Sequence, residues 1–444
     1  MSREQPPNTR SRATAVLLMA ACLWFAPRIG EAGIVLGPDT ELPFLADHYF
    51  VSLAVLEDGS FALGGTTTVE PDGDPQDGHP QFQVQAYSPA GTPLGGPFIP
   101  QPAYPVDTGS IGSLGDHYFV NWQHYLDKIS RATMLNRAGQ VMAKAFGWPN
   151  SDIEFYGSYD RYGAGPAWAF LPVIYTQAGV DSLGNTIRAP TLQAYGPDAQ
   201  PLGPPALLAG RQWLVSIDDT AINGEGRFVV VADQCLRKAN GTCRRVLQVF
   251  DATSRPQTPL LSAGLPSLTE NNTPPLVAMD SAGGLLAFWD HGTATLDTLL
   301  LRTFDRSGTP GAALTTLAKV ELPDDLAVPA RVVAIGTRRY AIFWSIYHNG
   351  DGTETLYLSE FHSPDLLDPP VAIATNASLG GLDPYHLAIN DSGHGVVVWV
   401  TVDQDNVFTG HLRSITIAAD GSELPAPPAP PPGPAHQAVS NEKR

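Results

Sequence analysis

The residues whose types and spacing could support chemistry lie closest together between Glu70 and His79. Within this stretch Asp72, Asp74 and Asp77 supply three carboxylates, and glycines between and after them allow the chain to bend. Carboxylate oxygens at close spacing suit calcium, although the spacing departs by one residue from that of the helix-flanked calcium loop. We predict a calcium site here; the alternative is that Asp and Gly are present because they form turns.

Two later loops, at residues 349–354 and 403–406, are also rich in Asp, Asn and Gly. If they lie beside the first loop, together they form an acidic rim that attracts cations. The pattern Asp-His-Tyr-Phe-Val occurs twice, at residues 47–51 and 116–120, but at different places in the repeat described below, so we interpret it as coincidence. No nucleophile elbow, zinc-protease, phosphate-loop or dinucleotide motif is present.

A second candidate segment contains the two cysteines that follow the N-terminal region. Cys235 and Cys243 flank Asn240-Gly241, and this dipeptide is typical of a β-hairpin turn. The thiols could therefore face each other, and in an exported protein we expect them to form a disulfide.

The same hairpin is the basic exception in an acidic chain. We interpret its cations either as a local patch for an acidic ligand or as solvated surface side chains. They are Arg237, Lys238, Arg244 and Arg245.

These segments are positioned by a repeat with an average step of about 55 residues. In each copy an extended segment ends in a large apolar anchor, and a turn residue follows four positions later. The anchors are Tyr87, Leu135, Tyr195, Phe250, Phe304, Phe361 and Ile417. Most copies have a second strand that ends in a bulky residue, and continuous apolar runs before it indicate packing on both faces. These residues are Trp122, Tyr175, Trp289, Trp344 and Trp399.

Such a repeat predicts an all-β fold, a seven-bladed β-propeller of four-stranded antiparallel blades over residues 33–424. The weak third copy leaves six or eight blades open, and a tandem of β-sandwiches is the structural alternative. The seventh copy meets a proline cluster after Leu424 and lacks a fourth strand of its own. We therefore expect residues 33–44 to complete the last blade and close the ring, and residues 425–444 to form a disordered Pro-rich tail.

The N-terminal segment, residues 1–32, has the pattern of a secretory signal peptide. A basic start precedes an apolar run from Ala13 to Ala26, and Gly30-Glu31-Ala32 fits a cleavage site. We predict cleavage after Ala32, a secreted or periplasmic location, and no integral membrane span in the mature chain. The alternatives are an uncleaved membrane anchor and a lipid anchor at Cys22.

Charge limits the class of ligand. The net charge of the full chain is −18, and it becomes −20 when residues 1–32, with four Arg and two Glu, are removed. Such a field repels phosphate backbones and anionic membranes, so a nucleic-acid partner is disfavoured.

The segment Phe304-Asp305-Arg306-Ser307-Gly308-Thr309-Pro310 follows a strand–turn–strand unit that ends in Trp289. In this pattern the chain resembles secreted or surface-attached bacterial β-propeller-like repeat proteins, over residues 45–424. The resemblance implies export and binding, and it carries over no catalytic residue.

In four-stranded blades the loops between strands two and three share one face, and the tight turns share the other. Here the first set is long and different in each copy, which is typical of a scaffold with function on one face. We expect an exported, monomeric, non-enzymatic binding or scaffold protein whose loop-rich face takes a protein or glycan partner. The alternatives are an extracellular polysaccharide hydrolase or lyase with carboxylates at the channel mouth, and a purely structural surface protein.

Overall fold

The computed structural model describes residues 33–46, 48–69, 79–100, 106–124, 130–142, 146–147, 173–180, 186–192, 203–204, 206–207, 213–236, 243–266, 273–379, 385–405 and 407–418. The expected signal peptide and the expected Pro-rich tail lie outside these residues. The described residues form antiparallel strands almost throughout, with one short helix, α1 (Pro43–Ala46). None of their helices is long and apolar enough to cross a membrane.

The described strands form seven antiparallel sheets, numbered here in the order in which the copies of the repeat follow one another along the chain. The sheet that also contains the N-terminal strands is therefore the last. Sheet 1 contains β3 (Tyr49–Val55), β4 (Phe61–Val69) and β5 (His79–Tyr87). Sheet 2 contains β6 (Val106–Leu114), β7 (His117–His124), β8 (Ser130–Leu135) and β9 (Phe146–Gly147). Sheet 3 contains β10 (Val173–Val180), β11 (Thr186–Leu192) and β12 (Ala206–Leu207). Sheet 4 contains β13 (Trp213–Ile222), β14 (Phe228–Leu236) and β15 (Cys243–Phe250).

The remaining three sheets have four or five strands. Sheet 5 contains β16 (Leu276–Met279), β17 (Leu285–Gly292), β18 (Leu296–Phe304) and β19 (Thr315–Glu321). Sheet 6 contains β20 (Asp325–Ala334), β21 (Arg339–His348), β22 (Thr353–His362), β23 (Leu366–Leu367) and β24 (Val371–Ala377). Sheet 7 contains β25 (Tyr385–Ile389), β26 (His394–Val402) and β27 (Phe408–Ile417), together with β1 (Ile34–Leu36) and β2 (Thr40–Glu41) from the N-terminal end.

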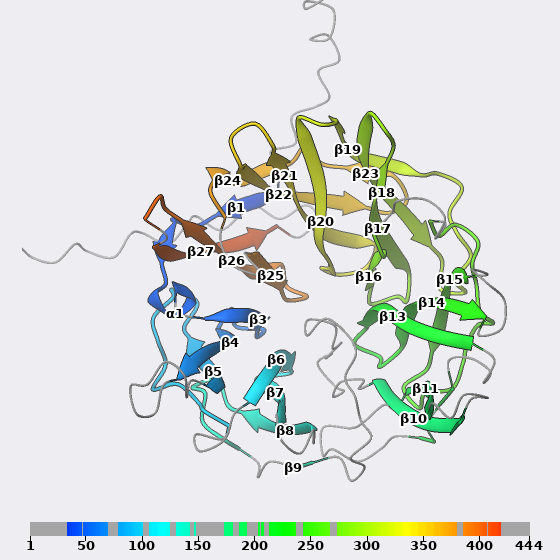
Figure 1. Cartoon of the computed structure of the whole chain (residues 1–444), viewed down its shortest axis with the longest axis horizontal. Coiled ribbons are helices and arrows are strands. Elements are labelled where there is room, and N and C mark those ends of the chain that lie inside the picture. Colours follow the sequence, from blue (N-terminus) through cyan, green and yellow to red (C-terminus); the bar gives the residue numbers. More distant parts are fainter. Residues whose placement is uncertain are drawn as a thin grey trace, which may run out of the picture.

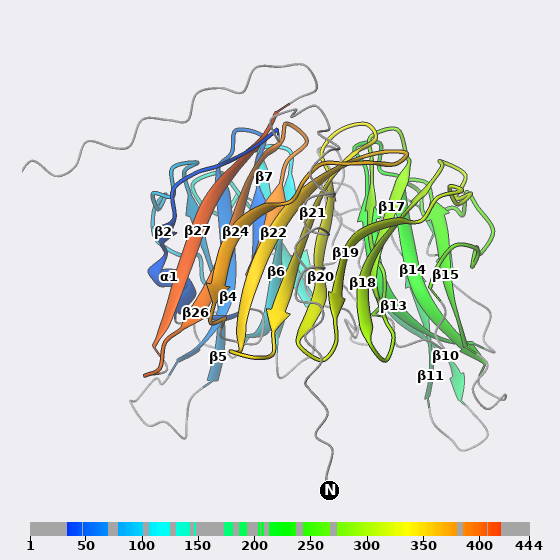
Figure 2. The ribbon, with the colours of Figure 1, turned by 90° about the horizontal axis from the view of Figure 1, so that it is seen from above.

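The sheets are arranged around a central axis (Figure 1). We call the strands nearest this axis the first strands; in sheets 1, 2, 4, 5, 6 and 7 they are β3, β6, β13, β16, β20 and β25. Among these first strands, β3 contacts β6 and β25, while β16 contacts β13 and β20. The side view shows the strands running along the axis, so that turns and loops gather at two opposite faces (Figure 2). All-β architecture, predicted from the repeat, is thus confirmed.

The predicted anchors stand where the third strand of each copy ends. Tyr87, Leu135, Phe250, Phe304 and Ile417 are the last residues of their strands. Phe361 is the penultimate residue of β22, and Tyr195 lies outside the described residues. The repeat therefore marks strand ends correctly in the copies that can be compared.

The turns after three of the anchors are formed by an Asp or Asn side chain that accepts hydrogen bonds from the backbone of its own turn. Oδ1 of Asp305 accepts hydrogen bonds from the backbone N–H groups of Ser307 (2.8 Å) and Thr309 (2.9 Å). Asn136 and Asp251 accept the same pair of bonds in sheets 2 and 4. Gly308 completes the turn with a φ of 77°, which costs a glycine little.

The prediction of four strands in every copy is wrong for sheets 1 and 4 among the described residues. Their fourth segments make isolated bridges instead of ladders, such as Val84 with Phe98 and Leu247 with Leu261. These segments contain prolines, including Pro97 and Pro259. Because proline has no N–H to donate, each proline removes a hydrogen bond that a ladder would use at its position.

The hydrophobic core lies between neighbouring sheets. Trp122, Trp289, Trp344 and Trp399 are between 2% and 4% exposed, so their predicted role in packing is confirmed. Trp399 packs between sheets 6 and 7 with Phe343 and Ile415. Their strands continue beyond the tryptophans, however, as β17 does from Trp289 to Gly292.

The N-terminal strands join the sheet that is farthest from them in sequence. Ile34 of β1 pairs with Ile417 of β27, and Thr40 of β2 pairs with Leu412 of the same strand. Leu45 of α1 is buried against sheets 1 and 7. This pairing of residues 33–44 with the last sheet is the one that the sequence predicts.

Candidate functional site

A cavity of about 490 Å³ lies along the central axis. The first strands of sheets 1, 2, 4, 5, 6 and 7 line it with side chains that are mostly small or apolar. The lining follows the second half of these strands and extends to the turns after them. The cavity is large enough for a small polar ligand or for part of a larger one.

Equivalent positions of the repeat form the mouth of this cavity. Each lies one or two residues after the end of a first strand, in the turn that leads to the second strand. They are Glu57, Gly115, Gly224, Ser281, Gly336 and Asp391. Four of the six are Gly or Ser, so most of this mouth is backbone and small side chains.

The two carboxylates of the mouth belong to neighbouring sheets, 1 and 7. Oε2 of Glu57 accepts a 3.1 Å hydrogen bond from the hydroxyl of Ser392. Desolvation of the Asp391 carboxyl group raises its pKa above the ordinary value, and the nearby negative charge of Glu57 raises it further. Among the described residues, the mouth is therefore acidic where sheets 1 and 7 meet, and its other four positions carry uncharged side chains or none.

Deeper in the cavity, polar lining residues hold the first strands together. Oδ2 of Asp219 accepts a 2.7 Å hydrogen bond from the backbone N–H of Val277 in the next sheet. The hydroxyl of Ser52 accepts a 2.9 Å bond from the N–H of Ile111, again between sheets. We assign these residues to the scaffold, because their polar atoms satisfy backbone groups.

Tyr385 lines the cavity and leads into a buried polar network. Its hydroxyl is 3.2 Å from Oγ of Ser345, which in turn hydrogen-bonds the carboxylate of Glu354. Ser345 is fully buried and Glu354 nearly so. If Ser345 donates to Glu354, the phenol donates to Ser345, so the ring of Tyr385 is fixed beside the cavity.

One cluster of described residues has the composition of a metal site. Glu360, His362 and Asp368 each place one ligand atom within 4.8 Å of the others, and such a set could hold a metal ion. Oε1 of Glu360 also accepts from Nε (2.8 Å) and Nη2 (2.5 Å) of Arg339. A cation bound there would have to compete with this guanidinium, and no feature of the cluster selects calcium.

The predicted calcium ligands Asp72, Asp74 and Asp77 lie outside the described residues. In the two related loops, carboxylates are used by their own turns. Oδ1 of Asp351 accepts from the N–H and hydroxyl of Thr353, and Oδ1 of Asp403 accepts from the N–H groups two and four residues later. These contacts agree with the interpretation that Asp is present in those loops to form turns.

The expected disulfide is present. Cys235 and Cys243 are directly opposite each other in β14 and β15 and are bonded.

One of the four basic residues of the hairpin, Arg245, is buried and is not part of a surface patch. Arg245 has a side chain that is 3% exposed, and Nε is 2.8 Å from Oδ1 of Asp233 and 3.4 Å from Oδ2 of Asp218. Arg244 donates to the side-chain oxygen of Gln234. Arg237 and Lys238 lie outside the described residues. Sequence reasoning missed the pairing because Asp218 and Asp233 come from other strands of the sheet.

The two Asp-His pairs occupy different structural positions. His117 opens β7 and pairs with Asp116, whereas His48 follows α1 and stacks on Phe44 at 3.9 Å. Asp47 lies outside the described residues. The different settings agree with the interpretation of coincidence.

No protein-family model matches the chain, and no curated protein is significantly similar to it. Among solved structures, it is similar to the β-propeller domain of the Trilobed protease from Pyrococcus furiosus (8% identity, 85% of this chain, 99% of that chain, TM-score 0.48). It is also similar to the WD40 domain of SCAP from fission yeast (9%, 86%, 98%, 0.39) and to the polysaccharide lyase Uly1 (9%, 83%, 90%, 0.44). The similar structures thus include β-propeller domains and an enzyme. At 8–9% sequence identity, the similarity assigns no ligand or activity to this chain.

Proposed function

We propose that this chain is an exported, non-enzymatic binding protein, a closed β-propeller in which sheets 1–7 are the seven blades. The ligand enters the cavity at the mouth formed by the turns between first and second strands. A glycan segment is the ligand class that we favour, because the cavity combines small apolar walls with hydroxyl and carboxylate groups. The loop-rich face, on the opposite side, remains a candidate surface for a protein partner.

The observation that carries this proposal is the composition of the mouth. An enzyme that hydrolyses glycosides needs two carboxyl groups aimed at one bond, while a binding site needs shape and a few polar contacts. Four Gly or Ser residues among six equivalent positions leave the mouth open and give it little acid–base chemistry.

One observation favours the alternative, a polysaccharide hydrolase or lyase. Glu57 and Asp391 are carboxyl groups on adjacent sheets, and the pKa of Asp391 is raised by desolvation and by Glu57. Two neighbouring carboxyl groups are the residue types that a glycoside hydrolase uses as acid and base. The two readings differ in whether the bound polysaccharide is shortened.

A carbohydrate array on the chain from Gly33 onward tests the proposal. Ser113 lines the cavity, so Ser113→Trp should fill it and abolish binding of the glycans that the wild type retains. Gln140→Trp is the matched control, because Gln140 is exposed on the outer turn of the same sheet. Chromatography of each bound glycan after incubation should show an unchanged chain length. Release of shorter or unsaturated products, lost in Glu57→Gln and Asp391→Asn, would instead establish the enzyme.

We also propose export directed by residues 1–32 and calcium binding at Asp72, Asp74 and Asp77. The close spacing of three carboxylates supports the calcium proposal. Calorimetric titration of calcium into the wild type and into Asp74→Asn tests it. Heat that is present in the wild type and reduced in the variant is expected, whereas no heat at millimolar calcium contradicts it.

A further inference from the structure

Two interfaces between sheets are closed by the same ion pair at the same positions of the repeat. Arg137 of sheet 2 pairs with Asp58 of sheet 1, and Arg306 of sheet 5 pairs with Glu225 of sheet 4. Both arginines stand two residues after an anchor, and both acids lie in the turn after a first strand. The two interfaces can therefore be compared residue by residue.

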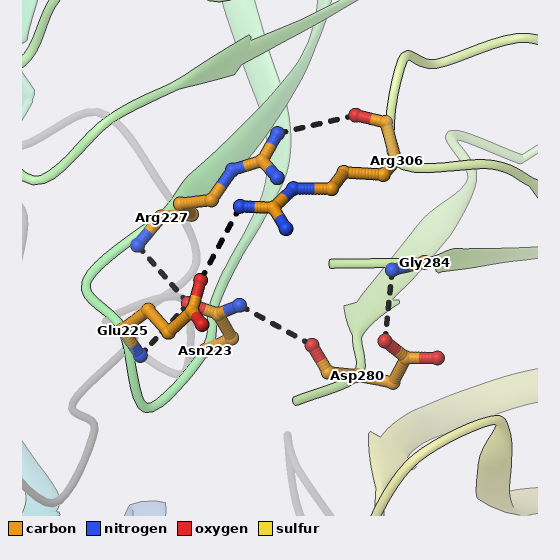
Figure 3. A network of polar contacts seen from close by, with 6 residues as sticks. All are labelled: Asn223, Glu225, Arg227, Asp280, Gly284 and Arg306. Carbon is orange, nitrogen blue, oxygen red and sulfur yellow. Dashed lines mark hydrogen bonds and ion pairs between the residues drawn. The ribbon is translucent and has the colours of Figure 1, made fainter. Parts of the chain in front are cut away.

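Among the positions at which the two interfaces differ, one adds a charge. Two residues after the acid, the interface of sheets 1 and 2 has Ser60, whereas the interface of sheets 4 and 5 has Arg227. Nη2 of Arg227 donates a 3.1 Å hydrogen bond to the carbonyl oxygen of Arg306, so the two side chains lie alongside each other (Figure 3). The Arg306–Glu225 pair is long, at 3.5 Å, and both side chains are more than half exposed.

The surroundings hold both arginines in place. Gly283 lies close to both side chains. A Cβ on it would be 2.9 Å from Nη1 of Arg227 and 3.3 Å from Cγ of Arg306. Oδ1 of Asp305 is used by its own turn, and Oδ1 of Asn223 accepts from the backbone N–H groups of Glu225 and Arg227. Burial and the neighbouring Arg306 guanidinium lower the pKa of Arg227.

The second guanidinium is not needed to close the interface, because Arg137 and Asp58 close the equivalent one without it. Two positive groups side by side repel each other, and the carboxylates of Glu225 and Asp251 offset this only in part, since the pKa of Arg227 remains lowered. An anion placed between the two guanidinium groups removes this repulsion and accepts hydrogen bonds from both.

We propose that Arg227 and Arg306 form an oxyanion site, which takes a carboxylate or sulfate group either as a free anion or on a sugar. The site lies on the face that carries the cavity mouth, since Asn223 and Gly224 of the same turn line the cavity. The acidic charge of the chain as a whole disfavours long polyanions, so the ligand carries one or a few such groups. The proposal goes beyond the binding function proposed above and does not depend on it.

Isothermal titration calorimetry at low ionic strength tests the site with two probes, sodium sulfate and trigalacturonate. We expect Arg306→Gln and Arg227→Gln each to weaken binding by about tenfold or more, since each removes a charged donor. Arg137→Gln, which removes the same charge from the same repeat position, should leave the affinity unchanged. Glu225→Gln removes the nearby negative charge and should strengthen binding.

The outcomes separate the two sources of the anion and the two proposals. Binding of sulfate alone assigns the site to a free anion, and binding of trigalacturonate assigns it to an anionic sugar. Lack of heat with both probes overturns the site, as does an equal loss of affinity in Arg137→Gln. Because Ser113→Trp fills the cavity and leaves both arginines intact, sulfate binding should persist in that variant whatever the glycan array shows.

Discussion

The side-chain amide of Asn390 donates a 2.8 Å hydrogen bond to the carbonyl oxygen of Leu56, which precedes it in the chain by 334 residues. The same amide donates to the carbonyl of Glu57 at 3.2 Å. Asn390 stands in sheet 7 and Leu56 in sheet 1, so one buried side chain joins the last sheet to the first. It also places Asp391 and Glu57 together at the cavity mouth.

Asn390→Ala should therefore lower the free energy of unfolding by about 2–3 kcal/mol, because the buried carbonyl of Leu56 and the partly buried carbonyl of Glu57 lose their donor and the turn loses its acceptor. Urea denaturation measures the change. Asn390→Asp keeps the oxygen that accepts from Ser392 and His394 and removes the donor. If the variant with Asp were as stable as the wild type, the contact between sheets would contribute nothing.

Asp58 should make the free energy of unfolding depend on pH in the acidic range. Burial raises its pKa, but hydrogen bonds from Arg137 and Ser60 outweigh this, and the net pKa lies below the ordinary value of 3.8. Its contribution is therefore present above pH 3.8 and is lost as pH falls through the lower, folded-state pKa. Asp58→Asn should reduce stability at neutral pH by less than about 1 kcal/mol, since the pair is exposed. The difference between variant and wild type should vanish in acid, as urea denaturation across the pH range would show.

Asp391 should behave in the opposite way. Desolvation and Glu57 raise its pKa in the folded state, so the protonated form is favoured by folding. Stability that Asp391 contributes is complete below pH 3.8 and is lost as pH rises through the raised pKa. Asp391→Asn should make the protein slightly more stable at pH 7 and no different in acid. A variant that is less stable at pH 7 would show that Asp391 and Glu57 do not repel each other.

Much of the fold follows from the sequence because the copies of the repeat share residues that form turns. Phe304 and Phe250 are followed by Asp, and in these turns its side chain bonds the backbone two and four residues later, a local pattern that sequence alone indicates. The pairing of residues 33–44 with the last sheet follows from counting strands and finding one missing. Arg245 could not be placed in this way, because its burial depends on two aspartates brought to it from other strands.

The cavity mouth was also beyond prediction in detail, although a signal exists. Glu57 and Asp391 occupy the same position of the repeat and are its two acidic members among the lining residues. Aligning the copies by their first turns would have found them. What such an alignment does not supply is that sheets 1 and 7 are neighbours, which requires the ends of the chain to meet.

The backbone conformation of the turn after Asn390 gives a further prediction. Gly393 has a φ of 78°, and a Cβ there would lie 2.3 Å from the carbonyl oxygen of Ile417. Gly393→Ala should lower the free energy of unfolding by about 2 kcal/mol or more, since it adds backbone strain and a clash with backbone. Gly350→Ala is the control, because a Cβ at Gly350 meets no atom within 4 Å. Equal stability of the two variants in thermal denaturation would contradict the close approach of Gly393 to the carbonyl oxygen of Ile417.

The central claim is that the protein binds a glycan segment in its central cavity without cleaving it. Calorimetric titration of the glycan best retained on the array, into wild type, Ser113→Trp and Gln140→Trp, tests this most directly. The account predicts binding by the wild type and Gln140→Trp, no binding by Ser113→Trp, and a glycan of unchanged length after the titration. Undiminished binding by Ser113→Trp, or recovery of a shortened glycan, would contradict it.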